Sequence, residues 1–246
     1  MLMLALLYFF SCGLISIVNG HGRMLEPPAR NMMWRFGYPT PPNYEDSELF
    51  CGGIAIQYLR NNGSCGVCGD RYDHPQPRPH ETGGMFATDI IARTYQPGQV
   101  IDVIVDIVAN HEGYFEFSLC PRGEDRFLET EECFQDNMLE LSDVSGTRYY
   151  VPHNNTGLFF MQVKLPKDVT CMNCVFRWHW HSGNNWGICD DGTMRKGCGP
   201  QENYRNCADI RIFAGAGIAG PIYYSNFNET KPESNVTDTE SRRKTE

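Results

Sequence analysis

Ten cysteines that follow a short apolar leader constrain the fold more than any other feature of the chain. Residues 1–18 are apolar and uncharged, and Val18-Asn19-Gly20 then supplies the small residues at which signal peptidase cleaves. This pattern predicts a signal peptide over residues 1–20, with cleavage before His21; a retained signal anchor is the alternative. Of the eleven cysteines only Cys12 leaves with the leader, so an even number enters an oxidising compartment. Secretion and pairing of all ten as disulfides are therefore predicted.

Two Cys-x-x-Cys pairs offer zinc binding as an alternative to disulfide formation. Cys65 with Cys68 and Cys171 with Cys174 have the spacing of zinc ligands. The two pairs lie far apart in the chain, outside the usual spacing of a zinc ribbon, and the leader favours oxidation. Disulfides are therefore favoured over zinc, and the sequence leaves the connectivity open.

Charge and length define a single acidic domain. The net charge of −9 excludes nucleic acid and anionic membranes as partners and is compatible with a neutral polysaccharide. Residues 21–222 are predicted to form one domain, expected to be monomeric. Residues 223–246 are polar and charged, which predicts a disordered tail. Four Asn-x-Ser/Thr sequons are candidate glycan sites, at Asn62, Asn154, Asn228 and Asn235.

Apolar residues alternate with polar ones in several short segments, which is the period of a β-strand. Segments 101–107, 114–119 and 208–213 show this period, and 157–165 and 174–181 are further β-rich segments. Clusters of Gly, Pro and Asn separate them. The pattern predicts an all-β fold, an antiparallel immunoglobulin/fibronectin-III-like β-sandwich with long disulfide-pinned loops and little helix. Segment 21–84 is expected to be irregular, with a short helix within 48–61.

A mature chain that begins at His21 carries an unusual chelator. Its α-amino group and imidazole Nδ1 can bind one metal ion together, and a second histidine would complete a planar set of three nitrogens. Such a set suits Cu(II). His111 follows a predicted strand, at an edge where sites gather. His179 and His181 share one face of another strand and are the competing pair, although a solvated face beside Arg177 is the favoured reading for them. Periodicity alone does not select the partner.

Four blocks of sequence resemble a known family, the arthropod lytic polysaccharide monooxygenases of auxiliary activity family fifteen, also described as type-four chitin-binding domains. The blocks are 21–23 (HGR), 110–115 (NHEGYF), 178–187 (WHWHSGNNWG) and 202–210 (ENYRNCADI). The similarity extends over residues 21–222. It implies one copper ion per chain, bound by the amine and Nδ1 of His21 and by Nε2 of His111. Tyr204 would lie near the axial position, and Ala109 would shape access to the opposite face.

The resemblance also implies an activity: a secreted copper enzyme that cleaves glycosidic bonds in crystalline chitin or cellulose by oxidation. Its partners would be the insoluble polysaccharide, an external electron donor, and O2 or H2O2. Trp34, Tyr38 and Trp186 are candidates for stacking on sugar rings, with core packing as the equal alternative. A non-catalytic chitin-binding module and a secreted copper carrier are the rival functions.

Overall fold

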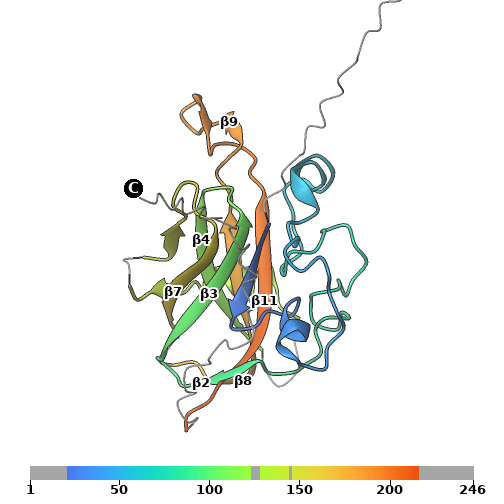
Figure 1. Cartoon of the computed structure of the whole chain (residues 1–246), viewed down its shortest axis with the longest axis vertical. Coiled ribbons are helices and arrows are strands. Elements are labelled where there is room, and N and C mark those ends of the chain that lie inside the picture. The colour runs from blue at the N-terminus through green and yellow to red at the C-terminus, as the bar shows by residue number, and fades with distance from the viewer. Residues whose placement is uncertain (1–20, 123–127, 144–145, 216–246) are drawn as a thin grey trace, which may run out of the picture.

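The computed structural model describes residues 21–122, 128–143 and 146–215, which form two packed β-sheets with long loops beside β11 (Figure 1). The first sheet has the order β1 (His21–Glu26), β3 (Val100–Ala109), β7 (Gly157–Lys164) and β5 (Glu140–Leu141). The second has the order β2 (Arg93–Tyr95), β11 (Asn203–Ile212), β8 (Cys171–His181), β4 (Tyr114–Pro121) and β6 (Arg148–Tyr150). A separate hairpin joins β9 (Trp186–Ile188) to β10 (Met194–Lys196).

The core lies between the two sheets, and the strand period selects its members. Alternating residues of β3 are buried against alternating residues of β8, namely Ile101, Val103, Val105 and Ile107 against Phe176, Trp178 and Trp180. The polar residues between them on β3, such as Asp102, face outward. The predicted all-β sandwich is confirmed, and each of the five predicted strand segments coincides with a strand of the structure.

Strand β1 corrects the expectation that the segment 21–84 is irregular throughout. It pairs antiparallel with β3, from His21 opposite Ala109 to Glu26 opposite Ile104. Its last three residues are all buried, so no alternation of polar and apolar residues marks it in the sequence. The prediction that the strands pair antiparallel also has one exception. Strand β2 runs parallel to β11, which a long loop connection permits.

Helix is scarce, as predicted. The expected helix within 48–61 is a six-residue π-helix, η2 (Ala55–Arg60). A 3-10 helix, η1 (Met33–Phe36), and a short α-helix, α1 (Glu131–Asp136), were not predicted. The side chain of Thr130 accepts a hydrogen bond from the Cys133 amide and so caps α1.

All ten cysteines of the described residues form disulfides, which confirms their predicted oxidation. The pairs are Cys51–Cys65, Cys68–Cys207, Cys120–Cys133, Cys171–Cys174 and Cys189–Cys198. The zinc alternative is therefore wrong. The Cys68–Cys207 bridge ties the long loops to β11, and it spans 139 residues of sequence.

A buried ion cluster joins the same loops to the sheet. Arg30 is 1% exposed and donates to both carboxylate oxygens of Asp209 on β11, and its Nη1 lies 2.6 Å from Glu129 Oε1. Each charge in the cluster is paired, as burial requires.

The predicted signal peptide (1–20), the tail (223–246) and the sequons at Asn228 and Asn235 lie outside the described residues. Asn62 and Asn154 are exposed, and their glycosylation stays a prediction. Among the described residues, no helix has the length and apolar character needed to cross a membrane.

Candidate functional site

The two histidines that the sequence analysis favours lie at the same end of the sandwich. His21 is the first residue of β1, and its Cα is the partner of Ala109 at the end of β3. His111 follows two residues later. The β9–β10 hairpin projects from this end too (Figure 1). Chain pairing therefore places two histidines that are ninety residues apart in the sequence at one end of the sandwich.

A tight turn fixes His111. Glu112 and Gly113 adopt positive φ angles of 56° and 80°. A Cβ on Gly113 would lie 1.9 Å from the carbonyl oxygen of His181, so only glycine fits there. The turn is anchored to the end of β8, because Trp180 Nε1 donates to the Glu112 carbonyl at 2.7 Å and the Gly183 amide donates to the His111 carbonyl at 2.8 Å.

Gly22 sets the approach of β1 to the core. A Cβ at this position would lie 2.8 Å from Ile107 Cδ1 and 3.1 Å from the Trp178 ring. Glycine therefore lets the backbone that carries His21 lie directly against the buried tryptophans of β8.

A carboxylate orients the His111 ring. Glu202 Oε2 lies 3.1 Å from His111 Nδ1, and the two side chains are about one-tenth exposed. A carboxylate only accepts hydrogen bonds, so Nδ1 carries the proton and Nε2 carries the lone pair. A carboxylate partner of this kind is the usual support of a metal-binding histidine.

A second carboxylate orients His21 in the opposite sense. Glu48 Oε1 lies 3.0 Å from His21 Nε2. Nε2 therefore carries the proton, and Nδ1 carries the lone pair. The segment that holds Glu48 is itself held between β1 and β11, because the Gly22 amide donates to the Ser47 carbonyl and the Arg205 amide donates to the Leu49 carbonyl.

Tyr204 lies beside His111 and is fully buried. Its ring centroid is 6.4 Å from that of His111 and 4.8 Å from that of Trp180, and its hydroxyl donates to Glu202 Oε2 at 3.3 Å. Burial raises the pKa of the Tyr204 phenol far above its ordinary value, and the Glu202 carboxylate adds to this effect. The phenol is therefore protonated at neutral pH and donates to the carboxylate that orients His111.

The sequence analysis missed both orienting carboxylates. Glu202 and Tyr204 are two residues apart, so on a strand their side chains share one face, and this spacing was a signal for Glu202. Glu48 carried no such signal, because it lies in a loop whose path is set by hydrogen bonds to β1 and β11.

The three aromatic candidates for stacking on sugar rings differ in the exposure of their side chains. Trp186 on β9 is 69% exposed, whereas Trp34 and Tyr38 are partly buried. The Tyr38 hydroxyl donates to the Ala92 carbonyl, and Trp34 packs edge-on against Tyr44. Ala109, beside His21, is partly exposed. Trp186 is thus the candidate whose ring is available to an external ligand.

The structure corrects the expected solvated face of His179 and His181. His179 and Arg177 are buried at 7% and 2% exposure, and only His181 is partly exposed. The loops and α1 cover this face, where Glu131 pairs with Arg177 and with Arg205, each at 2.8 Å. Burial holds the pKa of His179 well below its ordinary value, and Arg205 lowers it further.

Comparisons with known proteins establish the family. The family model described as lytic polysaccharide mono-oxygenase, cellulose-degrading, matches residues 21–210. A solved structure titled "Lytic Polysaccharide Monooxygenase AA15 from Thermobia domestica in the Cu(I) State" is similar at 51% identity and a TM-score of 0.76. The match covers 78% of this chain and 98% of that one. A search of curated proteins gave no match. The family match begins at His21, and the chain belongs to the lytic polysaccharide monooxygenases, in the arthropod group of auxiliary activity family fifteen.

Proposed function

We propose that this chain is a secreted copper-dependent monooxygenase that cleaves glycosidic bonds in crystalline chitin, cellulose or both. One observation carries the proposal: two carboxylates hold the two histidines in complementary tautomers. Glu48 leaves the lone pair of His21 on Nδ1, and Glu202 leaves that of His111 on Nε2. These are the two ring nitrogens that the family resemblance assigns as ligands.

The donor set fits copper. Cleavage before His21 would free its α-amino group, and this amine with the two imidazoles makes three nitrogen ligands, which suit Cu(II). Bound copper would supply the oxidising chemistry, through reduction by an external donor and reaction with O2 or H2O2. The protein's own task is to hold the nitrogens in place, since both rings are fixed by the β1–β3 pairing and by the turn at Gly113.

Substrate contact is assigned to the β9–β10 hairpin. The hairpin carries three exposed apolar side chains, namely Trp186, Ile188 and Met194, at 66–69% exposure. It follows the end of β8 that anchors the His111 turn, so it borders the proposed metal centre. An exposed indole beside the centre is suited to stacking on the flat face of a sugar ring.

The test is oxidative cleavage by correctly processed protein. Chitin and cellulose would be incubated with the protein, copper and ascorbate, and products identified by mass spectrometry. We expect oxidised oligosaccharides only when copper and ascorbate are both present. His111→Ala, or one extra residue before His21, should abolish copper binding and turnover together. His74→Ala is the matched control, because His74 is an exposed loop histidine whose replacement should change neither copper binding nor turnover.

Other outcomes identify the rival functions. A chitin-binding module would hold polymer equally well without copper and release no product. A copper carrier would bind the ion and ignore the polymer. Absence of oxidised products from every polysaccharide tried would refute the enzyme proposal.

A further inference from the structure

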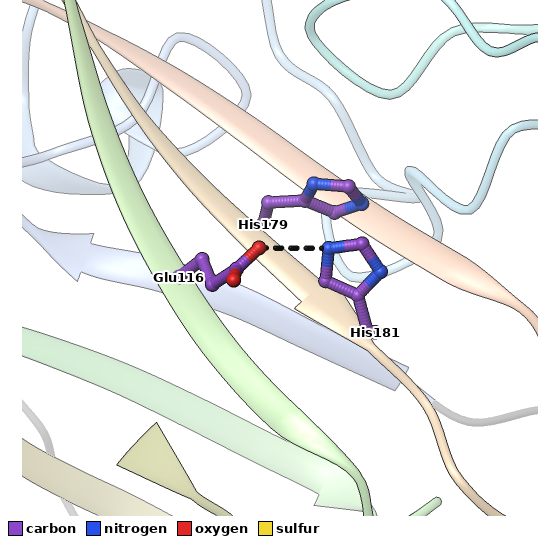
Figure 2. A group of neighbouring side chains, drawn as sticks. All are labelled: Glu116, His179 and His181. Atoms are coloured by element: carbon purple, nitrogen blue, oxygen red, sulfur yellow. Dashed lines mark hydrogen bonds and ion pairs between the residues drawn. The ribbon is translucent and has the colours of Figure 1, made fainter. Parts of the chain in front are cut away.

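Three potential metal ligands gather on the face of β4 and β8 that points away from the sandwich core (Figure 2). His179 and His181 are two residues apart on β8 and share that face. Glu116 on β4 is directly opposite His179 in the antiparallel register. One ligand atom from each of the three side chains lies within 4.8 Å of the others. Two imidazoles and one carboxylate are the protein ligands of many zinc sites that keep a fourth position open.

The three side chains line a cavity of about 220 Å³, which also contacts Arg177 and Arg205. The cavity has room for the water molecule that would take the fourth position. The cavity lies on the opposite face of β8 from the centre at His21 and His111. Trp180 lies between His179 and His181 in sequence, projects from the opposite face of β8, and packs near His111 with ring centroids 6.1 Å apart.

The His179 ring is held in place by two contacts at Nε2. Asn203 Oδ1 lies 3.0 Å from Nε2, and Arg205 Nε donates to Nε2 at 3.3 Å. The Asn203 amide nitrogen donates to Gln57, Tyr58 and Gln201, so its oxygen is turned to His179. A metal bound at Nδ1 would require the proton on Nε2, where it donates to Asn203, and would replace the Arg205 contact. The ring itself needs little movement for this change.

We propose that Glu116, His179 and His181 bind a divalent transition-metal ion, best matched by Zn²⁺, as a second metal site separate from the one at His21 and His111. Binding would replace the present contact of His181 Nε2 with Glu116 Oε2, which is 3.1 Å long.

The charges around the site set its strength. Arg148 donates to Glu116 Oε1 at 2.9 Å and competes with a cation for that carboxylate. Arg177 and Arg205 also face the cavity, and both pair with Glu131, which partly neutralises them. A site with these neighbours should bind Zn²⁺ more weakly than an all-anionic one, and removal of the Arg148 charge should strengthen binding.

Zinc titration of copper-loaded protein tests the proposal. The secreted protein would first receive one equivalent of Cu²⁺ and then be titrated with ZnCl2 by isothermal titration calorimetry. We expect one equivalent of Zn²⁺ to bind. His181→Ala and Glu116→Gln should each weaken it at least about tenfold. Arg148→Gln should strengthen it severalfold, a result that a purely structural role for these residues does not predict. His74→Ala is the control and should leave zinc binding unchanged.

X-ray absorption at the zinc edge of the native protein gives an independent readout that needs no variant. Two imidazole ligands and oxygen ligands are expected in the first coordination shell. The proposal is overturned if no zinc binds beyond the copper, if the shell lacks imidazole, or if folded His181→Ala and Glu116→Gln proteins bind zinc as tightly as the native chain. Circular dichroism establishes that each variant is folded.

Discussion

Replacement of Glu202 by glutamine tests the link between ring orientation and copper binding. The Glu202 carboxylate accepts from His111 Nδ1 at 3.1 Å and from the Tyr204 hydroxyl at 3.3 Å. Both donors contact the same oxygen, Oε2, so Glu202→Gln keeps these contacts only if its uncharged carbonyl oxygen takes that place, where it is a weaker acceptor than a carboxylate. If the amide is flipped instead, its N–H points at Nδ1 and moves the His111 proton to Nε2, the nitrogen that the proposed copper site needs.

The expected loss follows from this geometry. Substitution of a residue that orients a metal ligand typically costs 10- to 100-fold in metal affinity. We therefore expect the Kd for Cu(II) to rise about 10- to 100-fold, which corresponds to about 1.4–2.7 kcal/mol of binding free energy. The fold should survive, because weakening or losing one of these buried hydrogen bonds costs only about 1–3 kcal/mol of stability.

Competition with a chelator of known copper affinity measures the Kd, and circular dichroism monitors folding. Glu48→Gln is the matched comparison. Glu48 contacts His21 Nε2 at 3.0 Å, but its side chain is 43% exposed, so water can replace it and we expect a change below about fivefold. Glu140→Gln, at an exposed position on β5, should have no effect. The reasoning is wrong if Glu202→Gln binds copper as tightly as the native chain, or if Glu48→Gln loses more.

Three further predictions follow from single contacts. Gly22→Ala places a Cβ 2.8 Å from Ile107 Cδ1 and should lower the free energy of unfolding by about 1–3 kcal/mol, measured by urea denaturation. Trp186→Ala should weaken pull-down on chitin or cellulose while the copper Kd is unchanged, because the indole is 69% exposed; unchanged pull-down on both polymers contradicts the assignment. Burial acts to raise the pKa of the Glu129 carboxyl, but Arg30 outweighs burial and the pKa is lowered. The ionised carboxylate therefore stabilises the fold above about pH 4.3, and this stabilisation is lost as the pH falls through the lowered pKa. Urea titrations between pH 5 and 2 should show that loss, and Glu129→Gln should reduce the slope.

Much of the fold could be predicted because its strands bury one face and expose the other. The segment 101–107 alternates apolar and polar residues and forms the centre of β3. Strand β1 escaped prediction because three successive residues, Met24, Leu25 and Glu26, are all buried. The second face of β8 was expected to be solvated, since Arg177 and His179 are polar. Loops from distant sequence cover it, and paired charges make that burial tolerable.

The sequence by itself determined that ten cysteines would be oxidised, that the fold would be a β-sandwich, and which family the motifs around His21, His111 and Tyr204 resemble. These properties depend on composition, on a two-residue period and on contiguous motifs. Only the tertiary structure decided the disulfide partners, the carboxylates that orient the two histidines, and the gathering of Glu116 with His179 and His181. The physical reason is that these contacts join segments from different strands and loops, and side chains far apart in the chain meet only where backbone pairing and loop anchoring bring them.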